Sequence, residues 1–418
     1  MASKPHAEAT RAPGGMTHGF RALRVRNYRL FWIGQLISLI GTWMQGTAQA
    51  WLVLKLTNSP LALGVVTTFQ TLPIMALSLF GGAIADRMPK YRLVLGTQLV
   101  ALFQAAVFGL LVATDHIRLP YIYGLALLLG VINAIDTPTR QSFVSELVGR
   151  EDLPSAVALN SVLFNSARIV GPVIAGVLIA RLGIAPAFYI NAASFLGVIS
   201  GLLLMDRTAF RAAPPKTSDS ILRGVKEGLA YAWRTPAVLL VLVVVACIGT
   251  FGYNFNVVLP LLAGFVLHTD ATGFGLLSAC LGAGSLLGAL TTAYTRQVTM
   301  RRLLVGSGAF SLIFIAVAVS PSFALSTALL VGLGFAGITF ATTANTLLQL
   351  TVPDALRGRV MSLYILLFAG STPIGGMLIG TLSTTIGVSP TLALCGGLCL
   401  LGVLAVVLYR RRLAASAG

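Results

Sequence analysis

Long apolar stretches alternate with short polar segments along most of this chain. A helix needs about 20 apolar residues to cross the hydrocarbon core of a bilayer, and each stretch is about that long. Apolar residues continue around all sides of these stretches, whereas a soluble helix keeps one polar face. The pattern predicts an all-α integral membrane protein with twelve transmembrane helices. We expect these at residues 30–54, 60–85, 93–114, 119–139, 155–181, 184–205, 237–267, 271–294, 302–320, 322–350, 359–384 and 387–409.

The composition agrees with this interpretation. Apolar residues make up 56% of the chain and charged residues only 10%, whereas about 25% of the residues in soluble domains are charged. The net charge of +17 raises the question of nucleic-acid binding. Proteins that bind nucleic acid group their basic residues on one face or in long runs, but here the basic residues form short clusters between apolar stretches. We therefore expect no nucleic-acid partner.

The basic residues also indicate the orientation in the membrane. With twelve spans, 25 of the 29 Lys and Arg residues fall in the two tails and in every second loop. The other loops hold only Lys55, Arg118 and Arg181, and Arg168 lies inside a span. Because cytoplasmic loops carry an excess of Lys and Arg, we expect a multi-pass protein of the inner (plasma) membrane with both termini in the cytoplasm. The first apolar stretch is too long for a cleavable signal peptide, and we expect it to remain as the first span.

A polar break near the middle divides the chain into two halves. We expect two six-helix bundles around a central cavity, since substrate sites of transporters lie between such halves. The predicted parts are a cytoplasmic tail at 1–29, an N-terminal bundle at 30–206, a cytoplasmic linker at 207–236, a C-terminal bundle at 237–409 and a cytoplasmic tail at 410–418.

The linker contains an amphipathic segment. Ile221, Val225, Leu229 and Trp233 recur every four residues and would form one apolar stripe on a helix. This pattern is typical of a helix that lies on a membrane surface. A solvated linker helix is the alternative that the sequence leaves open.

Several classes of protein are disfavoured by what the chain lacks. The four cysteines, Cys247, Cys280, Cys395 and Cys399, lie in apolar stretches without nearby His or acidic residues, so we interpret them as packing residues and expect no metal site. No phosphate-binding loop of the Gly-x-x-x-x-Gly-Lys type is present, which argues against an ATP-driven pump. No Ser/His/Asp or two-His metal grouping lies in the spans, which argues against an enzyme.

The loop between the second and third spans, residues 81–92, reads Gly-Gly-Ala-Ile-Ala-Asp-Arg-Met-Pro-Lys-Tyr-Arg. It resembles the signature loop of the major facilitator superfamily, although Pro89 stands where the family usually has Gly. The resemblance implies that this loop holds the cytoplasmic side closed when the outer side is open. Glycine permits close helix packing, and an aspartate can accept hydrogen bonds from helix N-termini or from Arg. The matching residues, which we expect to act in gating, are Gly82, Asp86, Arg87, Lys90 and Arg92.

The fifth span carries a second motif. Gly171, Pro172 and Gly176 resemble the fifth-helix motif of the exporters of this superfamily, with Ala175 in place of one Gly. Small residues allow close packing and Pro172 bends the helix. Pro373 in the eleventh span follows Pro172 by 201 residues, close to half the chain, which agrees with two related halves.

Asp136 and Arg140 lie four residues apart at the inner end of the fourth span, so they can pair on one helix face. Together with Asn160, Asn165 and Arg168, this region resembles the branch of the superfamily that holds siderophore exporters and macrolide efflux proteins. We expect Asp136 and Arg140 to act in gating. The resemblance implies proton-driven antiport and no cofactor, while the residues themselves leave the proton-coupling site open.

Arg168 lies near mid-depth of the fifth span, and a charge inside the membrane is costly unless it has a function or a partner. One interpretation is that it faces the central cavity and binds an anionic or polar group of the substrate. The alternative is a structural Arg satisfied by helix carbonyls or by Asp136. Other polar residues expected along the substrate pathway are Gln35, Gln45, Gln49, Gln70, Asn133, Asn160, Asn165, Asn254, Asn256 and Asn345.

These observations favour a secondary active transporter that exports a small amphipathic molecule, either drug-like or siderophore-like. The expected partners are this small-molecule substrate and membrane lipids, and we expect a monomer. An importer or facilitator of a small metabolite with the same fold is the main alternative. A membrane enzyme or a scaffold that transports nothing is a third, which the missing catalytic groupings disfavour.

Overall fold

A computed structural model of the chain describes residues 20–210, 221–293 and 298–416. The side chains of residues 78–87, 150, 221–226, 293, 355 and 413–416 lie outside this description. The regular elements of the described part are helical. They are α1 (Arg26–Thr57), α2 (Pro60–Arg87), α3 (Lys90–Ala113), α4 (Leu119–Leu182), α5 (Ala185–Leu203), α6 (Ile221–Arg234), α7 (Pro236–Phe251), α8 (Phe255–Leu261), α9 (Ala271–Ala293), α10 (Met300–Val319), α11 (Phe323–Thr351), α12 (Asp354–Phe368), α13 (Thr372–Ile386) and α14 (Val388–Ser416).

Two of the predicted spans are interrupted in the structure, and the predicted loop between the fourth and fifth spans is helical on both sides of a glycine. The chain from Leu119 to Leu182 is one run of helix apart from Gly149, whose φ of 75° is readily adopted only by glycine. It therefore forms two spans, Leu119–Gly149 and Glu151–Leu182. The predicted seventh span consists of α7, α8 and a π-helical turn at Leu262–Val266, and the predicted eleventh consists of α12 and α13.

Eleven helical segments of the described residues are long and apolar enough to cross a membrane. The 32-residue helix α1 is not among them. Its sequence includes Gln35, Gln45 and Gln49, which lower its hydropathy. All three side chains are buried against neighbouring helices, as expected of polar residues in a bundle whose outer surface faces lipid.

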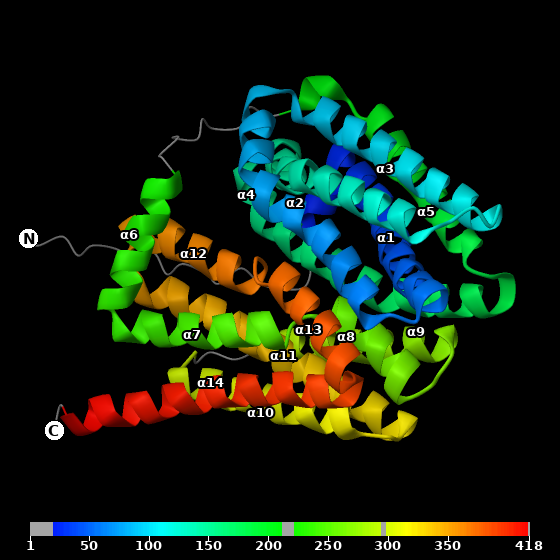
Figure 1. The fold of residues 1–418 in the computed structure, drawn as a ribbon. Helices are drawn as coiled ribbons and strands as arrows, with labels where there is room; N and C mark the ends of the chain where they lie inside the picture. Colours follow the sequence, from blue (N-terminus) through cyan, green and yellow to red (C-terminus); the bar gives the residue numbers. More distant parts are fainter. Residues whose placement is uncertain (1–19, 211–220, 294–297, 417–418) are drawn as a thin grey trace, which may run out of the picture.

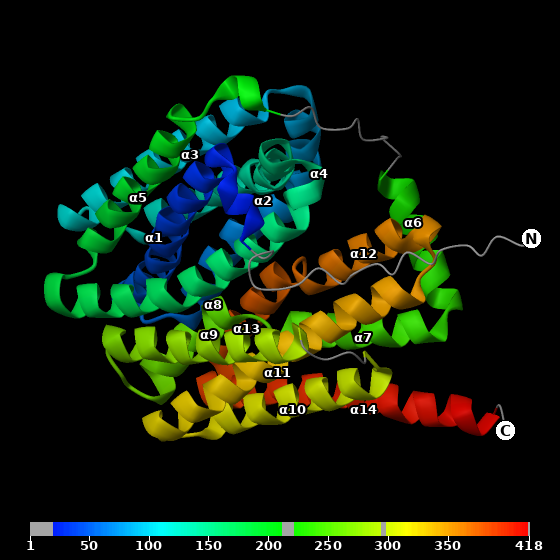
Figure 2. The ribbon, with the colours of Figure 1, turned by 180° about the vertical axis from the view of Figure 1, so that it is seen from behind.

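The helices form two groups. Helices α1 to α5 lie together, and α7 to α14 lie together with α6 at one end of their group (Figure 1). The groups meet where α4 packs on α9 and α2 packs on α13. Seen from behind, α9 lies between α4 and α11 and so belongs to the boundary of the two groups (Figure 2).

Close approach between the groups occurs toward the end of the molecule opposite α6, which we call the far end. A Cβ atom on Gly176 would lie 2.7 Å from the carbonyl oxygen of Ala271. Thr68 Oγ1 donates a hydrogen bond of 3.1 Å to the carbonyl oxygen of Pro373. At the other end, α12 packs on α6 and α7 in its own group, and the ribbons of α12 and α4 diverge (Figure 1).

Helix α6 is amphipathic, as predicted, and packs on α12 and α7. Glu227 forms an ion pair with Arg359 of α12, and the buried Gly228 approaches the backbone of the same residue. The apolar side chains of Leu229 and Trp233 remain 54% and 73% exposed. One side of α6 is thus attached to the C-terminal group while apolar side chains point outward.

Candidate functional site

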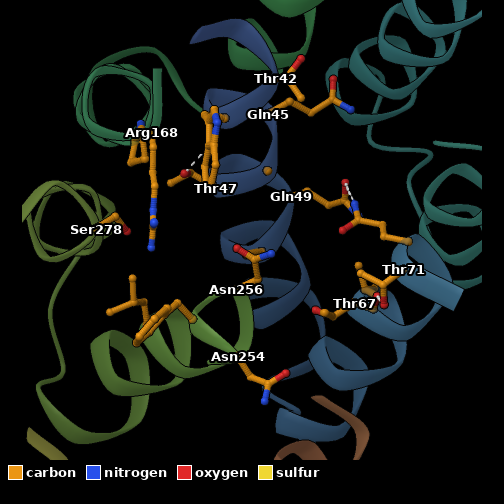
Figure 3. Close-up of a pocket in the computed structure, with 18 of the residues that line it drawn as sticks. Thr42, Gln45, Thr47, Gln49, Thr67, Thr71, Arg168, Asn254, Asn256 and Ser278 are labelled. Atoms are coloured by element: carbon orange, nitrogen blue, oxygen red, sulfur yellow. Dashed lines mark hydrogen bonds between the residues drawn. The ribbon is translucent and has the colours of Figure 1, made fainter. Parts of the chain in front are cut away.

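A cavity of about 460 Å³ lies between the two groups of helices. This volume is within the range of about 300–1,000 Å³ that is typical of small-molecule sites. One wall comes from α1, α2 and α4 and the other from α9 and the segment around α8. The side chains labelled in Figure 3 are polar lining residues from both walls, namely Thr42, Gln45, Thr47, Gln49, Thr67, Thr71, Arg168, Asn254, Asn256 and Ser278.

Arg168 is the one charged residue in the cavity lining, all of which belongs to the described part of the chain. Its guanidinium carbon lies 5.9 Å from the centre of the Trp43 ring, which is close enough for a cation–π interaction. Phe164 packs edge-on against Trp43 with ring centres 5.5 Å apart. In Figure 3 the Arg168 side chain extends into the cavity toward the level of Ser278 and Asn256. The structure therefore places Arg168 at the cavity rather than beside Asp136.

The glutamines of α1 are held by hydrogen bonds. Gln45 donates to Gln104 of α3 at 3.2 Å and accepts from Asn191 of α5 at 2.7 Å. Gln49 accepts from Gln70 of α2 at 3.1 Å. The Nε2 atom of Gln49 is buried and has no hydrogen-bond partner among the described residues.

Asn254 and Asn256 contribute to the opposite wall. The Asn254 Nδ2 atom donates to the carbonyl oxygen of Thr250 at 2.7 Å, which fixes the orientation of the amide. Its Oδ1 atom is buried without a partner in the described part of the chain.

Four residues expected along the pathway do not line this cavity. Gln35 is buried inside the N-terminal group and accepts from Arg140. Asn160 is exposed, and Asn165 donates to the carbonyl oxygen of Ser161 on its own helix at 2.8 Å. Asn345 accepts from Gln349 at 2.6 Å. Sequence spacing gave their depth approximately, but it did not fix which face of each helix meets the cavity.

The structure contains the ion pair between Asp136 and Arg140 that their spacing allowed. The Asp136 side chain is 1% exposed, and its Oδ1 atom also accepts from Thr97 at 2.6 Å and from Gln98 at 3.1 Å. Because α3 supplies both of these partners, the carboxylate is enclosed within the N-terminal group and does not line the cavity. Sequence reasoning did not identify Thr97 or Gln98, although polar residues within a predicted span were a usable signal.

The gating residues of the 81–92 loop are only partly described. The side chains of Asp86 and Arg87 and the surroundings of Gly82 lie outside the described part of the structure. Lys90 forms an ion pair of 2.6 Å with Glu146 of α4, and Arg92 is exposed. The Lys90–Glu146 pair connects the start of α3 to the end of the fourth span next to Gly149.

The glycines of the fifth-span motif lie at close helix contacts. A Cβ atom on Gly171 would lie 2.6 Å from the Trp43 Cβ atom of α1. Pro172 lines the cavity, and its carbonyl oxygen would be 2.5 Å from a Cβ atom on Gly275 of α9. Gly176 approaches α9 at Ala271, and Pro373 near the start of α13 contacts Thr68. The motif thus allows the two groups to approach each other at the far end.

A family model described as transmembrane secretion effector matches residues 17–417 of the chain. This model belongs to the major facilitator superfamily. Nearly the whole chain is matched. The chain belongs to the major facilitator superfamily. This confirms the resemblance inferred from the sequence motifs, and it indicates a transporter rather than an enzyme.

Curated members of the superfamily with similar sequences are exporters and transporters. The chain is 30% identical to the multidrug efflux pump Tap of Mycolicibacterium fortuitum, over 87% of the chain and 90% of the pump. It is 25% identical to the staphyloferrin A transporter of Staphylococcus aureus, over 88% of the chain and 92% of that protein. It is 24% identical to the enterobactin exporter EntS of Citrobacter koseri, over 91% of both chains. These relatives agree with the siderophore- and drug-exporter branch.

Solved structures show the same fold. A bacterial homologue of the human lysosomal transporter Spinster, in an inward-facing and occupied conformation, superposes with a TM-score of 0.70 at 14% identity, covering 95% of this chain and 98% of that one. A POT family transporter in complex with 5-aminolevulinic acid superposes with a TM-score of 0.73 at 12% identity, covering 93% and 96%.

Proposed function

We propose that this protein is a secondary active transporter that exports a small amphipathic molecule by alternating access. The observation that carries this proposal is the central cavity, whose two walls come from two groups of helices that approach each other closely at the far end. Rocking one group against the other would close the α6 end and open the far end around the same cavity. Because the cavity is complete within one chain, a monomer is sufficient.

The proposed topology has twelve spans in two six-helix bundles, with α1 added to the eleven segments that hydropathy identifies. The bundles correspond to residues 30–206 and 237–409, connected by the linker at 207–236. The excess of Lys and Arg in alternate loops supports a topology with α6 and both termini on the cytoplasmic side of the inner (plasma) membrane. In this topology we propose that the cavity opens toward the cytoplasm, where an exporter takes up its cargo.

Export is supported by the relatives, of which one is named a multidrug efflux pump and another an enterobactin exporter. The lining supports an amphipathic cargo, because the aromatic residues Trp43, Phe164 and Phe255 line the same cavity as the amides of Gln49 and Asn256. Such a surface binds an apolar body and orients it by a few polar groups.

The proposed energy source is the proton gradient, without a cofactor. Asp136 is the one buried carboxylate among the described side chains. Thr97, Gln98 and Arg140 enclose this carboxylate, and a rearrangement of the bundle that removed Arg140 would leave it buried without its cation. Asp136 is therefore the candidate for proton coupling.

The test is transport in vesicles that contain the purified protein in inverted orientation, with the lumen made acidic and a panel of fluorescent cargoes outside. We expect accumulation of at least one cargo above protein-free vesicles, and its loss when a protonophore collapses the gradient. Equal accumulation with and without a gradient would favour the facilitator alternative. No accumulation of any cargo would contradict the transport proposal.

A further inference from the structure

Arg168 carries the one formal charge among the side chains that line the cavity. No acidic side chain is present in the cavity lining, which lies wholly in the described part of the chain. The described carboxylates that form ion pairs do so with other cations. Their pairs are Asp136 with Arg140, Glu146 with Lys90, Glu151 and Asp152 with Arg21, Glu227 with Arg359, and Asp354 with Arg357.

The Arg168 guanidinium itself makes no hydrogen bond and no ion pair with any described residue. Its one specific interaction is with the face of the Trp43 ring. Arginine carries five N–H donors and stays protonated in proteins. A cationic group in a partly enclosed site of low dielectric constant is stabilised strongly by an opposite charge at short distance. The site therefore provides charged donors for an anion that no described residue of the chain supplies.

The surroundings of Arg168 restrict the rest of the ligand. Trp43 and Phe164 form an aromatic corner directly beside the guanidinium. These rings suit a cargo that has a flat apolar part next to its charged group.

We propose that the cavity selects amphipathic cargo that carries a carboxylate or a similar delocalised oxyanion, which pairs with Arg168 while an adjacent aromatic or apolar part packs on Trp43. This inference rests on the proposed transport function and names its substrate class. Two parallel N–H···O hydrogen bonds match the planar guanidinium to a planar oxyanion. A cationic cargo would approach an unpaired positive charge with no acidic residue to offset the repulsion, so the cavity discriminates against it.

The test is equilibrium binding in lipid nanodiscs by isothermal titration calorimetry, with three ligands that share a naphthalene body. The ligands are 1-naphthylacetate, 1-naphthylacetamide and 2-(1-naphthyl)ethylammonium, which differ in the charge of the head group. For the unmodified protein we expect the acetate to bind at least about tenfold more tightly than the amide, because charge-assisted hydrogen bonds are the stronger ones. We expect the ammonium compound to bind most weakly.

Substitution of Arg168 shows whether this preference comes from the proposed group. In Arg168→Gln the acetate should lose its advantage, while unchanged binding of the neutral amide shows that the cavity is intact. Arg168→Lys should retain part of the preference, since it keeps the charge but not the planar pair of donors. The matched control is Arg181→Gln, which removes an exposed arginine from the same helix and should leave all three affinities unchanged.

The proposal is wrong if the three ligands bind the unmodified protein equally, if none of them binds, or if Arg168→Gln keeps the preference for the acetate. The ranking of the ligands by the unmodified protein tests the proposal even if Arg168→Gln does not fold. Failure of the charge preference is distinct from failure of the transport function, because cargo accumulation in vesicles is measured separately and does not depend on these ligands.

Discussion

Gly64 of α2 and Gly376 of α13 approach each other so closely that a Cβ atom on Gly64 would lie 2.6 Å from the Gly376 carbonyl oxygen. This distance is shorter than a carbon–oxygen contact can be without displacement of the backbone. The contact joins the two groups of helices at the far end, where Gly380 also approaches Pro60 and Leu61. Closure of the far end therefore requires a residue without a side chain at position 64.

We predict that Gly64→Leu shifts the protein toward a conformation with an open far end. Overpacking costs about 1–3 kcal/mol, and a bias of that size changes a two-state equilibrium about 5- to 150-fold. The four native cysteines are replaced, and spin labels are attached to Lys55→Cys and Thr385→Cys. Electron–electron distance measurements between the two labels should then show a larger fraction of long distances in Gly64→Leu. Gly124→Leu is the control, because a Cβ atom at Gly124 meets nothing within 4 Å. An unchanged distance distribution in Gly64→Leu would contradict the role of this contact.

The sequence predicted the helical membrane fold and its family because both follow from local features. Apolar length identifies spans, and the 81–92 loop and the Gly171–Gly176 motif are contiguous. The interruptions were less visible: Gly149 bends the chain without any loss of helical pattern around it, so the fourth span was predicted to end too early. Helix α1 was predicted as a span although its glutamines keep it below the hydropathy that identifies the other eleven.

The site was harder to predict because its residues meet only in three dimensions. The depth of Arg168 within its span followed from counting residues, whereas the absence of any lining carboxylate required the positions of all the helices. Asn160, Asn165 and Asn345 are polar residues in similar spans, yet they do not line the cavity. The rotation of each helix about its axis distinguishes the two cases, and the low amphipathicity of lipid-embedded helices leaves that rotation undetermined.

Asp136→Asn should lower stability and impair proton-driven transport. The substitution leaves the Arg140 guanidinium, whose side chain is 24% exposed, without its carboxylate. An unpaired, partly buried group of this kind costs about 1–3 kcal/mol, and thermal unfolding in detergent would show a corresponding decrease in melting temperature. Arg140→Gln in the same protein should restore most of the loss because it removes the unpaired charge.

Asp354→Asn is the control for this prediction, because Asp354 pairs with Arg357 at the surface and its side chain is 88% exposed. Such pairs contribute about 0–1 kcal/mol. If Asp136→Asn retained full proton-driven transport, Asp136 would have no part in coupling, whatever its effect on stability.

The proposed orientation predicts which sites a membrane-impermeant maleimide can reach in intact cells. A cysteine introduced as Thr385→Cys should react from outside, since this exposed residue lies at the far end of α13. A cysteine introduced as Arg301→Cys, at the start of α10, should react only after the membrane is permeabilised. Reaction of Arg301→Cys in intact cells would show that the proposed topology is wrong, and the protein without added cysteines provides the background labelling.

Trp233 distinguishes between the two interpretations of α6. Its side chain is 73% exposed, and the exposed Leu229 lies one turn away on the same stripe. If α6 rests on the membrane surface, both side chains enter the region between head groups and acyl chains. In a protein whose other tryptophans are replaced by Phe, brominated lipids should then quench most of the Trp233 fluorescence, and acrylamide in the aqueous phase should quench little. A solvated linker helix gives the opposite pattern. Trp233→Phe in the same background measures the residual signal, and Leu229→Gln should reduce quenching by the brominated lipids because it removes apolar area from the surface that meets them.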